Sequence, residues 1–568
     1  MKDLVASLVS DALAAAVADG EVALPEPPPV EVERPRDPSH GDWATNVALR
    51  SAKAAGLAPR ALAEAIAARM AGHPDVAAVE VAGPGFINVR LSAAALQRVL
   101  VAARGGDSGF GGLRTGRGAR VQVEFVSANP VGPMHVGHGR WAALGDSMAR
   151  LLEFTGHDVQ REFYVNDAGV QMEVFGKSVA ARYMQLAGRE AAFEPEWYQG
   201  AYITGIAEEI RAQEGDAWVD APAEEREAHF REKAYAQVLE HLKRVLHAMG
   251  VDFDVWFSER TLYAPGEDGR TGIELAIERL RENGHVYEHE GATWFRSAAF
   301  GDDKDRVLRK ADGSYTYFAA DVAYHWDKFH DRGFDRVVDL WGADHHGYVK
   351  RMEAAVAALG FPGRLTLVIG QLVNLFRAGE AVRMSKRTGE MVTFEELLDE
   401  VGADAARYWF LRRSTDQPVD FDIALAKEQS ADNPVYYVQY AHARICSILR
   451  KAAGHPTDAA IDASEAAAER IPAEPPLELL DSEPELALMR RLAEFPEVVE
   501  RAAEDLTPHR LTRYAEDLAA VFHQFYTLCR VVSDDEALTG ARLYAVDATR
   551  LVLERALALL GVSAPQRM

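Results

Sequence analysis

The feature that most restricts the fold is a hydrophobic run, followed by a loop rich in glycine and histidine, and then a helical run. The run Val121–Val126 is typical of a buried strand, and His135, Gly137 and His138 precede a helical pattern that begins near Arg140. Strand, tight loop and helix in this order indicate a parallel α/β sheet. The positive end of such a helix favours a phosphate group, and glycine lets the backbone approach it.

Changes in composition divide the chain into three parts. Glycines between positions 105 and 118 separate an alanine-rich opening segment from the first strand, and Asn433-Pro434 interrupts a helical pattern. We expect a small α+β N-terminal domain at 1–112, a parallel-sheet domain at 119–430 with a helical insertion at about 175–250, and an all-helical domain at 431–568. The stretch rich in Pro, Ala and Glu at about 452–484 predicts a loop between helices.

Charge and cysteine content exclude several classes of protein. The net charge of −25 argues against promiscuous nucleic-acid binding, although a folded RNA can be held by local basic patches. The two cysteines, Cys446 and Cys529, have no metal-site spacing. Asp11 interrupts the apolar run Leu4–Ala18, which therefore predicts an amphipathic helix and not a signal peptide. With no apolar run of membrane length, we expect a cytoplasmic protein without a membrane partner.

The two histidines of the first loop are candidates for phosphate chemistry. His135 and His138 lie three residues apart, so both face one ligand across a single helical turn. Isolated histidines at this spacing are more often satisfied surface or core residues. The preceding strand and the intervening Gly137 favour the phosphate interpretation here.

A second basic segment lies far downstream, at Val382–Gly389. Its Lys386 is suited to offset the charge that develops when a nucleotide reacts. A basic loop alone is usually solvated surface, but its pairing with the histidines favours a catalytic role. Lys386 follows His138 by 386 − 138 = 248 residues, which leaves room for a full α/β domain with an insertion.

A third element supports this pair. The strand pattern Val337–Trp341 is followed by Gly342, Asp344, His345 and His346. An aspartate just beyond a strand end commonly holds ribose hydroxyls. A metal site is the competing interpretation, but adjacent histidines on a regular element point apart.

Two acidic residues are candidates for binding a cation near the strand ends. Glu124 lies in the first strand, and Asp321 follows Tyr317 by four residues, so these two share one face of a predicted helix. The alternatives are core packing for Tyr317 and a surface charge or helix cap for Asp321. The pattern alone does not choose between them.

The motifs resemble those of class I aminoacyl-tRNA synthetases. The sequence His-Val-Gly-His at 135–138 is similar to the HIGH signature, and 382–389 is similar to the KMSKS loop, with Arg383 and Arg387 as departures. The segment before His135, the Tyr317–Asp321 segment and both ends of the chain resemble the arginyl-tRNA synthetases. The resemblance implies a Rossmann-type catalytic domain and a C-terminal anticodon-binding domain.

The resemblance also implies a reaction, its substrates and its site residues. Arginine would be activated by ATP, with Mg²⁺ carried by the ATP and no separate metal site, and then transferred to tRNA(Arg) by a monomer. The catalytic residues would be His135, His138 and Lys386. The ATP-binding residues would be His135, Gly137, His138, Gly342, Asp344, Met384, Ser385 and Lys386. The arginine-binding residues would be Glu124, Ser127, Asn129, His138, Tyr317, Asp321 and His345. The tRNA-binding residues would be Phe86, Asn88, Tyr440, Arg444 and Met568.

Three alternatives remain at this stage. The chain could be a class I synthetase for another amino acid, a small nucleotidyltransferase that shares only the first motif, or a tRNA-binding homologue without activity. A small nucleotidyltransferase does not need 568 residues and a helical C-terminal part. A homologue without activity is expected to have lost one of His135, His138 and Lys386, and all of these are present.

Overall fold

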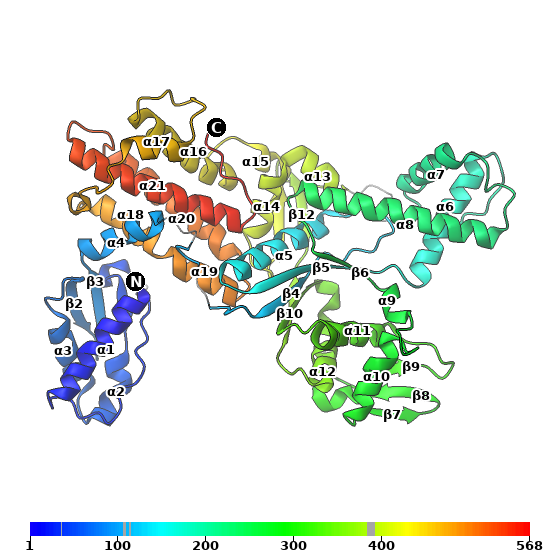
Figure 1. The fold of residues 1–568 in the computed structure, drawn as a ribbon, viewed down its shortest axis with the longest axis horizontal. Helices are drawn as coiled ribbons and strands as arrows, with labels where there is room; N and C mark the ends of the chain where they lie inside the picture. The colour runs from blue at the N-terminus through cyan, green and yellow to red at the C-terminus, as the bar shows by residue number, and fades with distance from the viewer. Residues whose placement is uncertain (36, 106–108, 113–114, 383–391) are drawn as a thin grey trace.

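The computed structural model describes residues 1–35, 37–105, 109–112, 115–382 and 392–568 (Figure 1). The N-terminal part is a three-stranded antiparallel sheet packed against helices. Its strands, in sheet order, are β1 (Trp43–Thr45), β3 (Phe86–Leu91) and β2 (Val76–Ala82). Its helices are α1 (Lys2–Ala18), α2 (Val47–Ala55) and α3 (Pro59–Met70). The helix α4 (Ala93–Arg104), capped by Ser92, leads from this sheet to the C-terminal helices.

A five-stranded parallel sheet forms the centre of the molecule. Its order is β11 (Leu365–Gly370), β10 (Arg336–Gly342), β4 (Arg120–Glu124), β5 (Asp158–Val165) and β6 (Val255–Ser258). The chain proceeds from β4 outward to β6 and then returns to β10 on the other side of β4. The strand order therefore reverses between β4 and β10, and in open parallel sheets ligands bind beside the carboxyl ends of the strands at such a point.

Helices connect these strands and form two lobes. Helix α5 (Val136–Phe154) follows β4, while α6 (Val170–Leu186), α7 (Ala201–Glu214) and α8 (Ala223–Ala248) form an insertion between β5 and β6. The second lobe contains a small sheet, β7 (Val286–His289), β8 (Ala292–Phe295) and β9 (Arg306–Arg309). Its helices are α9 (Arg260–Tyr263), α10 (Gly272–Glu282), α11 (Tyr317–Trp326) and α12 (Val349–Leu359). A π-helical turn, η3 (Asp327–Asp331), and a 3₁₀ turn, η4 (Ala343–Tyr348), flank β10.

The C-terminal third begins with a second small sheet and ends in a helical bundle. The sheet contains β12 (Val373–Arg377), β13 (Glu380–Ala381) and β14 (Val419–Asp422), with the helices α13 (Phe394–Val401), α14 (Ala403–Leu411) and α15 (Ile423–Lys427). The bundle contains α16 (Pro434–Ala452), α17 (Ala463–Arg470), α18 (Glu483–Ala493), α19 (Phe495–Glu504), α20 (His509–Leu528) and α21 (Glu536–Leu559). Helix α17 lies inside the stretch we expected to be a loop, because Asp462 caps it by accepting from Ser464 N–H.

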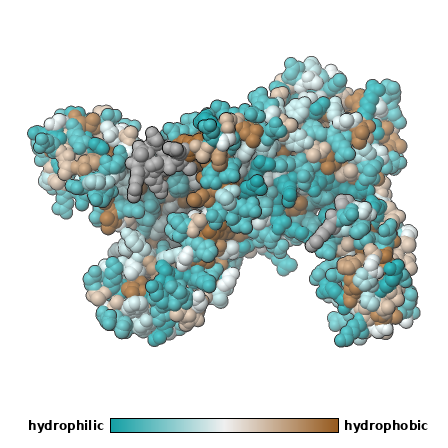
Figure 2. Space-filling view, turned by 180° about the vertical axis from the view of Figure 1, so that it is seen from behind, coloured by the Kyte–Doolittle hydropathy of each residue, from teal (hydrophilic) through white to brown (hydrophobic). Residues whose placement is uncertain are grey.

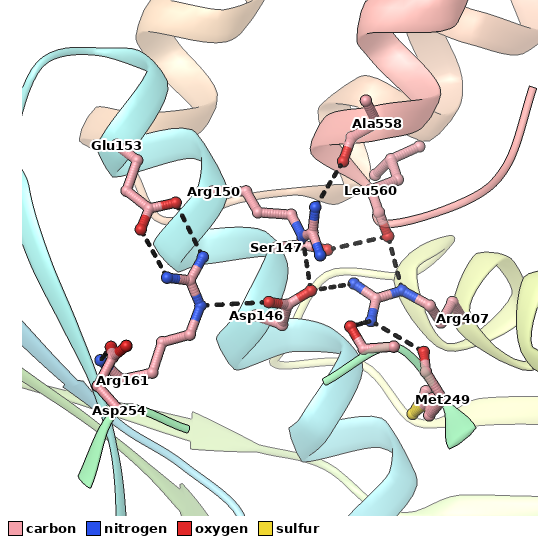
Figure 3. A network of polar contacts seen from close by, with 11 residues as sticks. Asp146, Ser147, Arg150, Glu153, Arg161, Met249, Asp254, Arg407, Ala558 and Leu560 are labelled. Carbon is pink, nitrogen blue, oxygen red and sulfur yellow. Dashed lines mark hydrogen bonds and ion pairs between the residues drawn. The ribbon is translucent and has the colours of Figure 1, made fainter. Parts of the chain in front are cut away.

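A buried polar network fastens the bundle to the central sheet (Figure 3). Asp146 of α5 accepts hydrogen bonds from Arg150, Arg161 and Arg407. The Arg407 guanidinium of α14 also reaches the carbonyl oxygen of Leu560 just after α21, 3.0 Å away. The helix that follows the first sequence motif is therefore tied to the C-terminal end of the chain.

The face of the molecule in Figure 2 is mostly hydrophilic. In the same view the N-terminal lobe and the lobe around α10–α12 project from one side of the central body, with open space between them. Within the described part of the chain, no helix has the length and apolar character needed to cross a membrane.

Candidate active site

The loop between β4 and α5 carries both histidines of the first motif. Val126 and Ser127 have φ angles of 69° and 41°, so the backbone turns sharply after the strand. His135 is the N-cap of α5, where its Nδ1 accepts the Gly137 N–H at 3.1 Å. His138 Nδ1 accepts the His135 N–H at 3.2 Å, and the two rings stack with their centroids 3.8 Å apart.

These caps determine which ring nitrogens carry protons. Because Nδ1 of His135 and of His138 accepts a backbone N–H, the proton of each neutral ring is on Nε2. Each imidazole therefore has a donor on the side away from its own helix backbone, at the positive end of α5. An anionic oxygen is the ligand that such an arrangement favours.

Gly137 and Gly139 are needed for close packing of this turn. A Cβ atom at Gly137 would lie 2.9 Å from the His135 ring, and one at Gly139 would lie 2.3 Å from the Phe394 ring. Gly139 therefore lets α13 approach α5. We expected Gly137 to bind ATP through a close approach of the backbone, and its position in the first turn of α5 suits that role.

The predicted residues Met384, Ser385 and Lys386 of the second motif lie outside the described residues. The chain that follows this motif does return to the histidines. Thr393 forms a β-bridge with His135, and Phe394 N–H donates to Met134 O at 2.9 Å. Thr393 and Phe394 are therefore anchored beside the first motif.

Gly342, Asp344 and His345 lie at the carboxyl end of β10, the strand next to β4. The Asp344 and His345 side chains are 82% and 59% exposed, and η4 presents them at the edge of the sheet. The exposed carboxylate of Asp344 suits the predicted contact with a ribose.

The predicted pair Tyr317 and Asp321 lies on α11, in a cluster of tyrosine and acidic side chains. Asp321 is half-buried and accepts a hydrogen bond from the Tyr348 hydroxyl at 2.5 Å. Tyr317, one helical turn earlier, is 67% exposed. A Cβ atom at Gly169 would lie 3.7 Å from the Tyr317 hydroxyl, so this ring covers the loop before α6.

Sequence reasoning missed a second carboxylate in this pocket, that of Glu259. Glu259 is buried directly after β6 and accepts from the Tyr263 hydroxyl at 3.3 Å. Burial is the largest cause that raises the pKa of Glu259, and the nearby Asp321 adds to it. Burial also raises the pKa of Asp321 above 3.8. The signal available in the sequence was an acid immediately beyond a strand pattern.

Neither Glu259 nor Asp321 forms an ion pair with another described residue. Their partners are tyrosine hydroxyl groups, which donate hydrogen bonds but carry no positive charge. A buried carboxylate without a cation is costly, and a cationic ligand removes that cost. The pocket is therefore suited to a small cation such as a guanidinium group.

Glu124, another predicted arginine ligand, lies in a layer of buried charges beneath the site. Glu124 on β4 stands in register with Asp339 on β10 and Glu162 on β5. Lys328 Nζ donates to Glu124 Oε2 at 2.6 Å and to Asp339 Oδ1 at 2.8 Å. Burial and Lys328 oppose each other at Asp339, and the pKa of Asp339 falls to about 2. Glu124 is thus partly engaged by the protein itself.

The remaining predicted arginine ligands flank Glu124. Ser127 donates to Glu124 Oε1 at 2.9 Å, and its hydroxyl oxygen accepts the Tyr164 N–H. Asn129 donates to Gln171 Oε1 at 2.9 Å, at the beginning of α6. These contacts fix the loop between β4 and α5 against β5 and the helical insertion.

The predicted tRNA ligands occupy two distant surfaces. In the N-terminal sheet Phe86 is 38% exposed, but Asn88 is only 6% exposed, so any contact by the Asn88 side chain requires it to move. Tyr440 and Arg444 line a cavity of about 670 Å³ in the helical bundle, together with His523 and Tyr526. Met568 is 54% exposed at the end of the chain.

Family models match the three parts of the chain separately. The "Arginyl tRNA synthetase N terminal domain" matches residues 3–91, "tRNA synthetases class I (R), catalytic domain" matches 106–417, and the "DALR anticodon binding domain" matches 438–568. The parallel sheet, with its histidine loop at the strand-order reversal, and these matches define a class I aminoacyl-tRNA synthetase.

Full-length relatives specify the family within this class. The chain is 49% identical to an arginine--tRNA ligase of Heliobacterium modesticaldum, over 99% of this chain and 98% of the relative. It is 50% identical to one of Moorella thermoacetica, over 100% and 99% of the two chains. The chain belongs to the arginyl-tRNA synthetase family, and it is an enzyme that ligates arginine to tRNA.

A solved structure agrees with the fold. The arginyl-tRNA synthetase of Thermus thermophilus superposes with a TM-score of 0.75 at 23% identity, and the match covers both chains in full. This similarity extends over the N-terminal part, the parallel-sheet domain and the helical bundle. The multidomain α/β fold expected from the sequence is confirmed.

Proposed function

We propose that the predicted site residues, together with Glu259, divide the ligation of arginine to tRNA between two adjoining pockets. In the first step the arginine carboxylate attacks the α-phosphate of ATP, so that arginyl-adenylate forms and pyrophosphate leaves. In the second step the 2′-hydroxyl of the terminal tRNA adenosine attacks the adenylate, and AMP leaves. Both reactants of the first step are anionic, so positioning and positive charge control its rate.

The nucleotide pocket lies at the N-terminus of α5. His135 and His138 would donate from Nε2 to the phosphate oxygens, a role that their capped Nδ1 atoms support. Lys386 would add a positive charge as pyrophosphate forms, with Met384 and Ser385 beside the nucleotide. Gly137, Gly342 and Asp344 would contact the triphosphate and the ribose. The β-bridge between Thr393 and His135 supports a nucleotide pocket to which the chain after the second motif returns.

The arginine pocket lies at the carboxyl end of β6, two strands from β4. The guanidinium group of the substrate arginine would lie between Asp321 and Glu259, and the Tyr317 ring would cover it. The observation that carries this proposal is a pair of adjacent carboxylates with no cationic partner among the described residues. The α-amino and carboxylate groups would meet Glu124, Ser127, Asn129, His138 and His345.

Mg²⁺ would enter with ATP. The groups around the histidine loop are imidazole and backbone N–H donors, which suit phosphate oxygens, whereas Mg²⁺ prefers oxygen ligands and retains several waters. This donor set therefore fits an ion held by the triphosphate, and the exposed Asp344 carboxylate is an oxygen ligand that would suit it. The ion would neutralise part of the negative charge of the phosphate groups.

The three domains would share the tRNA. We place their limits at 1–112, 119–430 and 431–568, with Phe86 and Asn88 contacting the elbow and Tyr440, Arg444 and Met568 contacting the anticodon. The cavity beside Tyr440, with several aromatic rings, supports the stacking of unpaired bases. We further propose that the enzyme acts as a monomer in the cytoplasm, which sedimentation and fractionation would test.

The arginine pocket is tested by comparing arginine with citrulline, which has the same shape but a neutral urea group. If two carboxylates face the guanidinium group, citrulline should bind at least about 100-fold more weakly than arginine, because neither carboxylate would then have a cationic partner. In the Asp321→Asn/Glu259→Gln variant this discrimination should largely disappear. Equal affinities of the unmodified enzyme for arginine and citrulline would place the guanidinium group elsewhere.

A further inference from the structure

The helical insertion α6–α8 contacts the loop that precedes the two histidines, although it projects from the side of the molecule opposite the helical bundle (Figure 1). This loop runs from Asn129 to Met134 and leads into His135, the N-cap of α5. Because Pro130 and Pro133 have no backbone N–H, two residues of the loop cannot donate backbone hydrogen bonds. The shape of the loop therefore depends on contacts with other segments.

The central contact is a hydrogen bond from Tyr202, the second residue of α7. Its hydroxyl donates to the carbonyl oxygen of Val131 at 2.9 Å. Burial raises the pKa of the Tyr202 hydroxyl, so this group stays protonated and remains a donor. At the beginning of the loop, Asn129 Nδ2 donates to Gln171 Oε1 of α6 at 2.9 Å. Two helices of the insertion thus hold the same loop.

The Tyr202 ring lies close to two glycines. A Cβ atom at Gly132 of the loop would lie 2.8 Å from both Cζ and the hydroxyl oxygen of Tyr202, and one at Gly200 would lie 2.4 Å from Cε1 of the same ring. Neither glycine has a positive φ angle, so the backbone conformation itself does not require glycine at these positions. The approach of the ring requires it, and the chain leaves room for this aromatic side chain on two sides.

The other end of the loop is fixed to a different element. Met134 O accepts a hydrogen bond from Phe394 N–H at 2.9 Å, and His135 forms a β-bridge with Thr393. The loop is thus held by the insertion near its beginning and by α13 at its end. The position of the His135 cap, and with it the direction in which both imidazole Nε2 atoms point, depends on these two supports.

We propose that Tyr202 is a positioning residue for the formation of arginyl-adenylate. Its hydrogen bond to Val131 holds the loop so that His135 and His138 meet the phosphate groups of ATP. This inference rests on the proposed role of these histidines. Tyr202 acts through the loop backbone and does not itself touch a substrate. Placement matters because a displacement of about 1 Å at a reacting group lowers a rate by about 100-fold.

The test is Tyr202→Phe, which removes the hydroxyl group and keeps the ring. The first step is measured as arginine-dependent exchange of pyrophosphate into ATP, with tRNA(Arg) present. We expect kcat/KM for ATP to fall about 3- to 10-fold, as the loss of one hydrogen bond predicts. The Kd for arginine, measured by calorimetric titration, should stay unchanged, because the arginine carboxylates Asp321 and Glu259 lie on other elements.

The matched control is Tyr183→Phe. Tyr183 lies on α6 of the same insertion, and its hydroxyl donates to the carbonyl oxygen of Gly215, just after α7, at 2.6 Å. Both variants should lower the unfolding temperature, but only Tyr202→Phe should lower kcat/KM for ATP. If the two variants had the same exchange kinetics, the Tyr202 hydroxyl would contribute only to stability, and the inference would be overturned.

A second set of variants does not depend on the hydroxyl group. In Gly132→Ala the new methyl group meets the Tyr202 ring, so kcat/KM for ATP should fall about 10-fold or more. Tyr202→Leu shortens the opposing side chain and gives this methyl group room. Adding Gly132→Ala to Tyr202→Leu should therefore cause little further loss. An equal loss in both backgrounds would show that the ring does not act on the loop, which would overturn the inference.

His135→Ala distinguishes a failure of this inference from a failure of the proposed function. If His135→Ala lowers kcat/KM for ATP and Tyr202→Phe does not, only the positioning role of Tyr202 is refuted. If neither variant changes kcat/KM for ATP, His135 does not act on the phosphate groups. The proposed nucleotide pocket is then refuted together with the inference.

Discussion

At the scale of single residues, the arginine pocket depends on the Asp321 carboxylate. Asp321→Asn keeps the shape and the hydrogen bond to Tyr348 but removes the charge. Removing one partner of a buried ion pair costs about 3 to 5 kcal/mol, because the remaining charge is left without its counter-charge. We therefore expect the Kd for arginine to rise about 100-fold or more. Calorimetric titration measures this change, and the Kd for ATP should stay constant. Asp331→Asn, at an exposed position of η3, is the control and should leave both values unchanged.

The same pocket predicts a pH dependence of arginine binding. Arginine binds the ionised carboxylates, and burial raises the pKa of Asp321 and of Glu259 in the free enzyme. As the pH falls, the Kd for arginine should therefore begin to rise at a higher pH than the ordinary carboxyl values of 3.8 and 4.5 would give. In Asp321→Asn, the Kd for arginine should begin to rise at lower pH, since the Asp321 charge helps to raise the pKa of Glu259.

Thermal unfolding gives an independent measurement of the same effect. A carboxyl group with a raised pKa in the folded chain stabilises the free enzyme at low pH, and this stabilisation disappears as the pH rises through that pKa. Arginine supplies the missing cation only to the ionised pocket. The increase in unfolding temperature caused by saturating arginine should thus be larger at neutral pH than at a pH near the ordinary carboxyl values of 3.8 and 4.5. An equal increase at both values would contradict the prediction.

The sequence predicts only some of the residues of this pocket, because the others come together through the tertiary structure. The four-residue spacing of Tyr317 and Asp321 places both on one helical face, and the structure has them on α11. Glu259 follows a strand that lies two positions away from β4 in the sheet, and no local pattern indicates which strand ends become neighbours. The contact between Asp321 and Tyr348 likewise joins two separate elements.

At the scale of elements, the π-helical turn η3 explains how Lys328 reaches the sheet. Tyr324 and His325 of α11 already face the strands, and the wider turn lets Lys328 enter between Glu124 and Asp339 as well. Such turns are rare and are often found at functional sites. The helical pattern of the sequence predicts α11 but contains no signal for the extra residue per turn.

Lys328→Met should destabilise the parallel-sheet domain strongly. Lys328 is fully buried, and its removal leaves Glu124 and Asp339 without their shared cation, which costs about 3 to 5 kcal/mol. A clear decrease in unfolding temperature is expected by calorimetry. Adding Glu124→Gln to this variant should recover part of the loss, because one unpaired charge is removed. If Lys328→Met/Glu124→Gln were no more stable than Lys328→Met, the ion pair would not be the source of the effect.

At the scale of the whole molecule, breaks in composition predict the three domains. They give no information about the contacts between the domains. Arg140, Arg407 and Asp146 all lie within helices, where an arginine or an aspartate usually faces solvent. Here all of these side chains are buried, because each joins segments that are far apart in the chain. Local periodicity cannot distinguish such a residue from one on a solvated face.

Arg407 connects the domains most directly, and its loss should uncouple their unfolding. Its guanidinium group bonds Asp146 of α5, the carbonyl oxygen of Leu560 after α21, and that of Met249 after α8 (Figure 3). In Arg407→Met these carbonyl groups lose their donor, although Arg150 and Arg161 still balance Asp146. We expect calorimetry to resolve separate transitions for the parallel-sheet domain and the helical bundle.

The matched control for this prediction is Arg450→Met. Arg450 is as fully buried as Arg407 and also donates to carbonyl oxygens, but those of Ile461, Thr457 and Gln566 all belong to the helical bundle. Its loss should lower the unfolding temperature while the parallel-sheet domain and the bundle still unfold in one transition. If Arg407→Met and Arg450→Met gave the same calorimetric profile, burial of an arginine would explain both. The Asp146 network would then not be what makes the nucleotide-binding helix and the bundle unfold together.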